Sequence, residues 1–167
     1  MRIVFVRHAE AVERTEGIPD EGRYLTPDGR FLFRKTAKTM RDEGLDPNLI
    51  LTSPYLRAVQ TADILAEKLS YVGSLLAMKE LAPGFDRDAL TQVILSYRPV
   101  KELVIVGHEP DLSTVISSLL SLPEGFLLEK GAALKLSVDP DNLDSQASFK
   151  WMAVGRKLIT SEKKLVS

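Results

Sequence analysis

The sequence contains only two histidines, and each closely follows a short run of apolar residues. His8 comes after Ile-Val-Phe-Val-Arg, and His108 comes after Leu-Val-Ile-Val-Gly. Continuously apolar, β-prone runs of this kind are typical of central strands that are covered on both faces of a sheet. In an open α/β sheet, ligands bind beyond the carboxyl ends of the strands. We therefore expect His8 and His108 to lie together at one edge of a sheet.

Two arginines are expected at the same edge. Arg7 directly precedes His8, and Arg57 lies early in a helix whose start is indicated by Ser53 as N-cap, followed by proline. Helical side chains lean toward the helix N-terminus, so Arg57 can reach back over the end of the preceding strand. The same helix terminus offers free N–H groups and the positive end of the helix dipole, both of which favour an anion.

Two arginines and two histidines would together form a site for a dianionic phosphoryl group. The planar guanidinium of arginine can hold two phosphate oxygens at once. A neutral histidine nitrogen can attack phosphorus and form a covalent phosphohistidine, which water then hydrolyses. Such a transfer depends mainly on positioning and on charge neutralisation. Because the attacking imidazole must be neutral, we expect activity to vary with pH in the range where histidine titrates.

Other kinds of site fit the sequence less well. Two histidines without an H-E-x-x-H pair and without any cysteine form a thin ligand set, so we expect no metal and no other cofactor. The motifs G-x-x-x-x-G-K-[ST] and G-x-G-x-x-G, which bind nucleotides, are absent from the sequence. A net charge of −1 offers no field that would attract nucleic acid or an anionic membrane. With no signal peptide and no run of 18 apolar residues, the expected location is cytoplasmic.

The order of the predicted elements indicates an α/β fold. Strands are predicted at 2–6, 49–52, 74–78 and 103–106. Helices are predicted at 27–43, at 54–69, at 87–97 and from Pro110-Asp111 onward. Residues 131–138 and 147–154 are predicted to form a hairpin. We therefore expect 1–167 to be a single domain, a three-layer α/β/α sandwich on a mostly parallel central sheet with an antiparallel element at one edge.

The segment between the first strand and the first helix is polar and irregular. Residues 9–25 are predicted to form a loop over the edge of the sheet, and a loop of that length is usually functional or mobile. Thr26 is predicted to cap the following helix, with Pro27 at its first position. The inner face of that helix is predicted to consist of Leu32, Phe33, Ala37 and Met40.

Four motifs resemble those of a known family. Val6-Arg7-His8-Ala9-Glu10-Ala11 is similar to the Arg-His-Gly signature of the histidine phosphatase superfamily, once called phosphoglycerate mutase-like. The family's order continues with Leu25-Thr-Pro-Asp-Gly29, with Ser53-Pro-Tyr-Leu-Arg57-Ala-Val-Gln-Thr61-Ala62 and with Val104-Ile-Val-Gly-His108. The short chain and its Leu-Thr-x-x-Gly segment resemble in particular the small, SixA-like phosphohistidine phosphatase branch.

The resemblance implies a phosphoglycerate mutase-like fold and a metal-independent phosphatase. His8 would become phosphorylated, Arg7, Arg57 and His108 would bind the phosphoryl oxygens, and Ser53 would cap the helix that orients Arg57. The expected substrate is phosphohistidine on a protein, since no long insertion closes the site between Arg57 and His108. The alternatives are a small phosphorylated metabolite with the same mechanism, or an adaptor module that binds phosphate without turnover. The oligomeric state stays open.

Two positions depart from the family pattern or leave a role open. Ala9 stands where the superfamily usually has glycine, which makes the approach of a ligand to the backbone slightly more crowded. Family comparison points to Glu80, in Glu80-Leu-Ala-Pro, as the general acid. Glu109 is ranked second, because it follows His108 where the acid phosphatase branch has aspartate. A third possibility is that no acid is needed, because a phosphohistidine leaving group depends on one less than a sugar or serine phosphate does.

Overall fold

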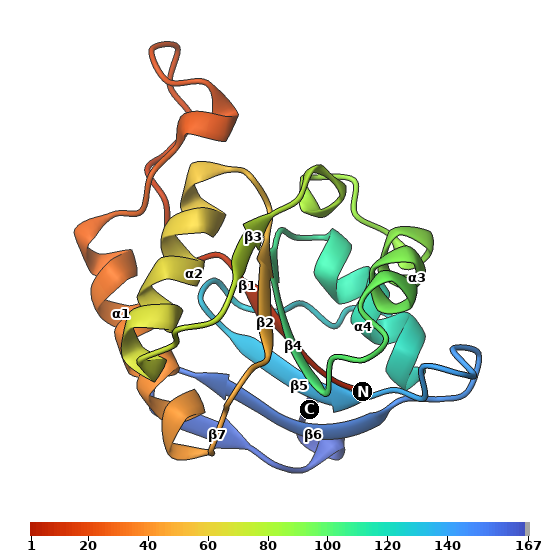
Figure 1. The fold of residues 1–167 in the computed structure, drawn as a ribbon. Helices are drawn as coiled ribbons and strands as arrows, with labels where there is room; N and C mark the ends of the chain where they lie inside the picture. The colour runs from red at the N-terminus through yellow and green to blue at the C-terminus, as the bar shows by residue number, and fades with distance from the viewer. Residues whose placement is uncertain (166–167) are drawn as a thin grey trace.

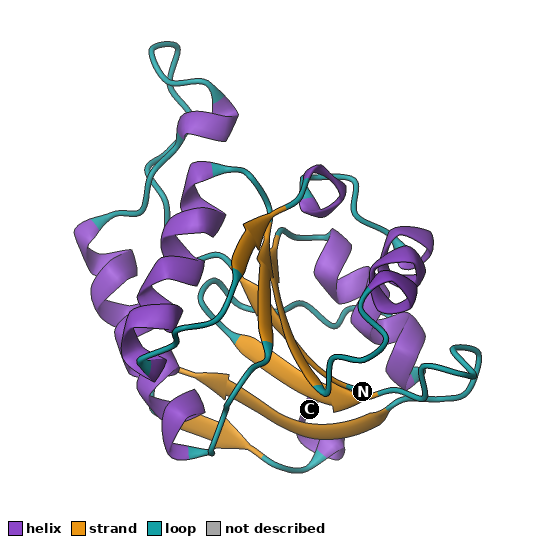
Figure 2. Ribbon diagram, in the orientation of Figure 1, coloured by secondary structure: helices purple, strands orange, loops and turns teal. Residues whose placement is uncertain are grey.

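The computed structural model describes residues 1–165 and has three layers, which Figures 1 and 2 show. The central sheet has seven strands in the order β3-β2-β4-β1-β5-β6-β7. Helices α1 (Pro27–Asp42) and α2 (Leu56–Leu69) cover one face, and α3 (Arg87–Ser96) and α4 (Asp111–Leu120) cover the other. The predicted three-layer sandwich is therefore confirmed. The strands are β1 (Arg2–Arg7), β2 (Leu49–Thr52), β3 (Leu75–Ala77), β4 (Glu102–Gly107), β5 (Ala133–Ser137), β6 (Ser148–Val154) and β7 (Lys157–Ile159).

The sheet has a parallel half and an antiparallel half. Strands β3, β2, β4 and β1 are parallel to one another. Strand β5 pairs antiparallel with β1, and β6 and β7 continue the antiparallel part. The predicted hairpin corresponds to β5 and β6, but β7 was not predicted. That strand has only three residues, too few for an alternating pattern to be recognised, and it follows a turn at Gly155, where φ is +57°.

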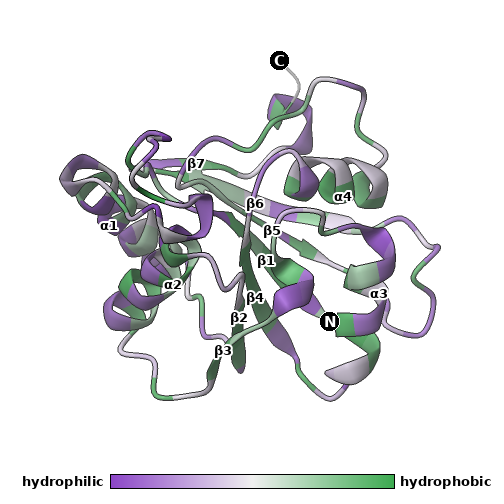
Figure 3. Cartoon of the chain, turned by 90° about the horizontal axis from the view of Figure 1, so that it is seen from above, coloured by the Kyte–Doolittle hydropathy of each residue, from purple (hydrophilic) through white to green (hydrophobic). Residues whose placement is uncertain are grey.

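Each face of the sheet has its own apolar core. In β1, Ile3 and Phe5 pack on the side of α3 and α4, whereas Val4 and Val6 pack on the side of α1 and α2. The side chains of β4 alternate in the same way. Figure 3 shows these central strands as hydrophobic segments between the two layers of helices. Because these side chains are fully buried on both faces, the ends of β1 and β4 are held rigidly.

The start of α1 agrees with the prediction, but part of its buried face does not. Oγ1 of Thr26 accepts a hydrogen bond of 2.9 Å from the N–H of Gly29, as expected for an N-cap. The prediction that Leu32 faces the core is wrong, since its side chain is 54% exposed. Leu32 lies 100° around the helix from Phe33, at the edge of the buried stripe, and Thr36 fills that side instead.

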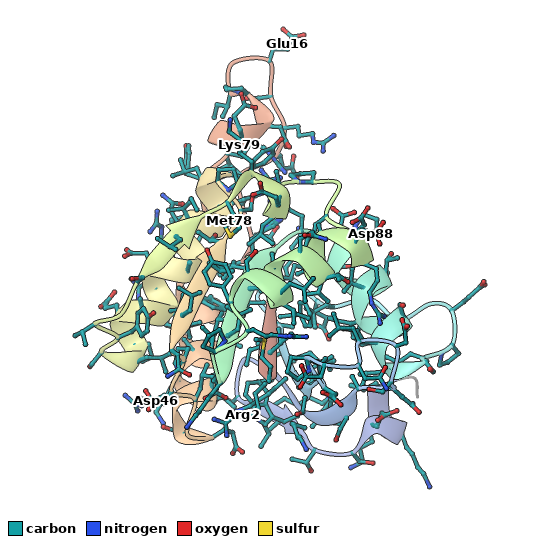
Figure 4. All side chains as sticks on the ribbon, turned by 45° about the vertical axis from the view of Figure 1, so that its right-hand side comes forward. Arg2, Glu16, Asp46, Met78, Lys79 and Asp88 are labelled. Atoms are coloured by element: carbon teal, nitrogen blue, oxygen red, sulfur yellow. The ribbon has the colours of Figure 1, made fainter. Side chains whose placement is uncertain are left out.

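Residues 9–25 form an arm that extends away from the body of the molecule (Figure 1). Its two limbs are joined by an isolated bridge between Ala11 and Leu25, and Glu16 lies at its tip (Figure 4). A short 3-10 helix, η1 (Asp20–Gly22), lies on the returning limb, and two more are η2 (Lys79–Leu81) and η3 (Glu162–Leu165). None of the helices in the described residues combines the length and apolar composition needed to cross a bilayer.

Candidate active site

The carboxyl ends of β1 and β4 bring the two histidines together. The strands pair in parallel with Arg7 opposite Gly107, so the residues that follow them leave the sheet at the same level. The ring centroids of His8 and His108 lie 5.3 Å apart, with an angle of 56° between the planes. Both side chains are buried. The two histidines thus share one site, as their positions after the strands predicted.

The surroundings of His8 determine which of its nitrogens carries the proton. Nδ1 lies 2.7 Å from the carbonyl oxygen of Ala9, which can only accept a hydrogen bond, so the proton belongs on Nδ1. Nε2 then carries no proton, and its lone pair accepts a hydrogen bond of 3.2 Å from Nε–H of Arg57. Burial lowers the pKa of His8 to about 4; the bond to Ala9 opposes this shift, and the charges of Arg57 and Arg7 add to it. At neutral pH, His8 is therefore a neutral imidazole with a nucleophilic Nε2.

His108 is held by a serine hydroxyl. Its Nε2 lies 2.7 Å from Oγ of Ser53, and the same Oγ accepts a hydrogen bond of 3.2 Å from the N–H of Tyr55. Nδ1 of His108 is buried and has no hydrogen-bond partner among residues 1–165. Burial, together with the charges of His8 and Arg57, lowers the pKa of His108 to about 3. His108 is thus also neutral at neutral pH, and its Nδ1 is available to a ligand.

The prediction that Ser53 caps α2 is wrong. The helix begins at Leu56, and its N-cap is Tyr55, whose side chain makes no capping bond within the described chain. A residue before proline is restricted to extended backbone, so Ser53 cannot enter the helix and its hydroxyl reaches only two residues ahead. As a consequence, the hydroxyl of Ser53 forms a hydrogen bond with His108, and Arg57 is the second residue of α2.

Arg57 connects His8 to the arm. Its side chain is almost fully buried, and its Nε donates to His8. Nη1 donates to the backbone oxygen of Asp20 at 2.7 Å, and Nη2 lies 3.3 Å from Oδ2 of the same residue. The helix around Arg57 is tied to β1 through Thr61, whose Oγ1 donates to the Arg57 carbonyl and accepts from the N–H of Ala9. The position of the guanidinium is therefore fixed on three sides.

Arg7 has donors left over for a ligand. Its Nη1 donates a hydrogen bond of 2.8 Å to the carbonyl oxygen of Leu128. Its Nε is buried and has no partner within the part of the chain that the structure describes. A buried N–H of a charged group without a partner is costly, so this donor is suited to an anion that enters the site.

A cavity of about 250 Å³ connects these groups. Its walls carry five cationic side chains and only two carboxylates, which makes it a strongly positive site suited to a dianion. The cations are Arg7, Arg14, Arg23, Arg57 and Lys130, and the carboxylates are Asp20 and Glu109. Sequence reasoning missed Arg14, Asp20, Arg23 and Lys130. For Arg14, Asp20 and Arg23 the available signal was the density of charged residues within a long irregular segment, but this alone does not show which of them face the site. Lys130, in the loop before β5, carried no such signal.

The two candidate acids differ in position. Glu80 lies in η2 and is exposed, and it does not belong to the cavity lining as described. Glu109 lines the cavity, and neither of its carboxylate oxygens, both buried, has a hydrogen-bond partner within residues 1–165. Burial raises the pKa of Glu109, while the nearby Ser113 and Arg7 oppose that shift. Glu109 is therefore the carboxyl group that the geometry favours for proton transfer.

Comparison with known proteins agrees with this geometry. The family described as the histidine phosphatase superfamily (branch 1) matches residues 3–83. An uncharacterized protein of Picosynechococcus sp. (strain PCC 7002) is 36% identical over 115 residues, which cover 67% of this chain and 68% of that protein. The chain belongs to the histidine phosphatase superfamily. It is accordingly a phosphatase of the histidine phosphatase type.

Within the superfamily, the chain is similar to SixA. The phosphohistidine phosphatase SixA of Escherichia coli (strain K12) is 25% identical over 153 residues, which cover 90% of this chain and 92% of SixA. A solved structure of the protein histidine phosphatase SixA complexed with tungstate has a TM-score of 0.81 and 22% identity, and the match covers 93% of this chain and 97% of that one. The expected phosphoglycerate mutase-like, SixA-like fold is therefore confirmed.

Proposed function

We propose that this phosphatase removes the phosphoryl group from phosphohistidine on a protein, through a covalent intermediate on His8. The observation that carries the proposal is the orientation of His8. Its Nδ1 is engaged by the carbonyl of Ala9, while the unprotonated Nε2 meets Arg57 in the positive cavity. A neutral nitrogen held in this way is a nucleophile, and the surrounding cations compensate the charge of the group that it attacks.

The proposed reaction has two transfers. In the first, the lone pair of His8 Nε2 forms a bond to phosphorus, the bond from phosphorus to the substrate's imidazole nitrogen breaks, and that nitrogen takes up a proton from solvent. In the second, a water oxygen attacks phosphorus and loses a proton to solvent, the bond to His8 breaks with its electron pair returning to Nε2, and inorganic phosphate leaves. His8 is then again neutral and ready for another cycle.

Three groups hold the phosphoryl oxygens during both transfers. Arg7 contributes its unpartnered Nε, and Arg57 contributes the N–H groups that now meet Asp20. His108 contributes Nδ1–H. The hydroxyl of Ser53, which accepts from the N–H of Tyr55, can donate its own proton to Nε2 of His108, and in that arrangement the single imidazole proton lies on Nδ1.

A protein substrate is favoured by the surroundings of the cavity. Between Arg57 and His108 the chain forms only α2, β3, η2, α3 and β4, all within the described residues, and no further helix is inserted over the site. The similarity to a phosphohistidine phosphatase supports the same substrate class. A phosphorylated imidazole is also a leaving group that needs little help from an acid, which suits a site whose first-ranked candidate, Glu80, is exposed.

The decisive test is to trap the intermediate. The enzyme is mixed for milliseconds with ³²P-phosphoramidate, denatured in alkali, in which phosphohistidine survives, and digested for mapping. We expect label on His8, none in His8→Ala, and slower labelling of His8 in His108→Ala, which serves as the matched control because the chain has only these two histidines. Label elsewhere, or activity without label, contradicts the mechanism. Turnover of a phosphohistidine peptide against sugar and nucleotide phosphates then separates the protein substrate from a small metabolite.

A further inference from the structure

A second hollow lies along the outer side of α1 and shares no lining residue with the catalytic cavity. Its volume is about 720 Å³, and its walls come from α1, from Lys68 near the end of α2, and from Arg156 in the turn between β6 and β7. We call this hollow the basic groove. The residues that define it are Phe31, Arg34, Lys35, Lys38, Lys68 and Arg156.

The basic groove concentrates positive charge. Its five cationic side chains face two carboxylates, Asp42 and Glu43. One of these, Asp42, is already paired with Lys38 at 2.5 Å and with Arg41 at 3.2 Å. The whole chain has a net charge of −1, so the positive charge of the groove is a local feature and does not reflect a basic protein as a whole. Such a face attracts an acidic partner and speeds its encounter.

Exposed apolar side chains adjoin the same face. Phe31 is 59% exposed and Leu32 is 54% exposed, and Nζ of Lys35 lies 4.3 Å from the centre of the Phe31 ring. The packing of α1 does not need these side chains, since its core contacts come from Phe33 and neighbouring buried residues. Aromatic residues and arginine next to one another are typical of protein interfaces. They favour a protein partner; because an exposed ring can also stack on a base, single-stranded RNA is included in the test.

One end of the basic groove, at Phe31, lies two residues from Gly29 at the base of the arm. The first turn of α1 lies against the arm's base, where Gly29 leaves no room for a side chain beside the backbone oxygen of Glu10. Glu10 follows the nucleophile by two residues. From Phe31 to Asp42 the helix rises about 16 Å, so one protein surface of ordinary interface size, about 800 Å² per partner, can cover the cavity mouth and the groove together.

We propose that the basic groove binds an acidic segment of the phosphorylated protein while its phosphohistidine occupies the catalytic cavity. This proposal rests on the proposed function and names a feature of its substrate: a run of aspartate or glutamate near the phosphorylated histidine. An extended chain covers about 3.3 Å per residue, so an acidic run of about five residues spans the groove from Phe31 to Asp42.

The test uses two synthetic peptides, each with one phosphohistidine. One has a run of about five glutamates beside the phosphohistidine, and the other has glutamines at the same positions. The parent enzyme is expected to show a KM about tenfold lower for the glutamate peptide at low salt, with the preference lost at high salt. In the double variant Arg34→Glu/Lys35→Glu the preference disappears, whereas turnover of phosphoramidate is unchanged. Neither residue forms an ion pair that the structure describes in residues 1–165, so the substitution breaks no contact of this kind.

The matched control is Lys163→Glu/Lys164→Glu, which makes the same change of charge on exposed lysines of η3, outside the groove. It should keep the preference for the glutamate peptide. Equal turnover of both peptides by the parent enzyme, or an equal loss in the control, overturns the docking proposal. The docking proposal is also overturned if single-stranded RNA binds the parent but not the groove variant, while the groove variant still prefers the glutamate peptide. If the parent hydrolyses neither peptide nor phosphoramidate, it is the proposed function itself that fails.

Discussion

Oδ2 of Asp20 lies 3.3 Å from Nη2 of Arg57, and the backbone oxygen of Asp20 accepts from Nη1 of the same guanidinium at 2.7 Å. Asp20 also contacts Arg23 at 2.9 Å and Arg14 at 3.5 Å. Burial alone raises the pKa of Asp20, but the charges of Arg57 and Arg23 outweigh it, so the pKa lies below its ordinary value. An anionic side chain from the arm thus occupies the Arg57 donors that we propose for the phosphoryl group.

Replacement of Asp20 by asparagine should strengthen the binding of phosphate analogues. The ion pair is partly exposed and is therefore worth up to roughly 1 kcal/mol, so Asp20→Asn should lower the inhibition constant of tungstate by up to about fivefold. The measurement is competitive inhibition of phosphoramidate hydrolysis. Glu16→Gln, which removes a charge at the tip of the arm (Figure 4), is the control and should leave the constant unchanged. Weaker inhibition in Asp20→Asn would show that Asp20 orients Arg57 instead of competing for it.

Removal of the Ser53 hydroxyl should impair His108 without unfolding the protein. Ser53→Ala takes away the group that holds Nε2 of His108, so either nitrogen can carry the proton and the donor to the phosphoryl group is lost part of the time. We expect kcat to fall by about tenfold, or roughly 1.4 kcal/mol, with a small change in KM. Thr36→Val removes a buried hydroxyl that bonds Gly155 far from the histidines, and it should lower stability but not kcat. Equal kcat values for Ser53→Ala and the parent would exclude the positioning role.

The choice between Glu109 and Glu80 can be made with substrates that differ in leaving group. Glu109→Gln should slow hydrolysis of a sugar or serine phosphate by about 10²-fold, because the alkoxide leaving group needs a proton. It should slow phosphohistidine hydrolysis much less. Glu80→Gln should change neither rate, since Glu80 is exposed and outside the cavity lining. The opposite result, with Glu80 carrying the larger effect, would restore the order that family comparison suggested.

The central strands and the convergence of the two histidines with Arg7 and Arg57 could be predicted from sequence because they depend on short, strong patterns. Strands β1 and β4 are uninterrupted apolar runs, and polar residues follow directly where the chain leaves the sheet. Arg57 was placed correctly although the helix start was not. The proline after Ser53 signalled the beginning of α2, and a shift of two residues still leaves Arg57 in the first turn.

The contribution of the arm could not be predicted in the same way. Asp20, Arg14 and Arg23 lie in an irregular segment with no period, and what brings them to the site is a set of long-range contacts with Arg57. The proton positions on His8 and His108 depend likewise on single contacts, with the Ala9 carbonyl and with Ser53. Contacts of this kind depend on the packed structure and produce no regular residue spacing that could be recognised in the sequence.

The glycine of the Leu-Thr-Pro-Asp-Gly segment should be required for stability. A Cβ at Gly29 would lie 2.3 Å from the backbone oxygen of Glu10, which is closer than side chains are found. Gly29→Ala should therefore lower the free energy of unfolding by about 1–3 kcal/mol, even though alanine favours helix by up to about 1 kcal/mol. Gly17→Ala is the control, because nothing lies within 4 Å of the added atom, and it should change the stability by less than about 0.5 kcal/mol. Urea denaturation measures both. Equal stability of Gly29→Ala and the parent would mean that the backbone at Glu10 moves enough to accommodate the added Cβ without cost.

The two histidines should titrate far below the ordinary range of histidine. Burial and neighbouring cations lower the pKa of His8 to about 4 and that of His108 to about 3, so both lose their proton well before neutral pH. Below pH 4, His8 gains a proton and the lone pair of Nε2 is no longer available, so phosphorylation of the enzyme should fall as the pH drops through 4. Above about pH 5, the rate should no longer depend on the protonation of His8. This moves the pH dependence expected from an unperturbed histidine to lower pH. NMR titration of the imidazole C–H signals, assigned by their loss in His8→Ala, measures both values directly. An inflection near pH 6.5 for His8 would show that the cavity admits enough water or anion to keep the imidazole protonated up to that pH, and about half of the proposed nucleophile would then be charged at pH 6.5.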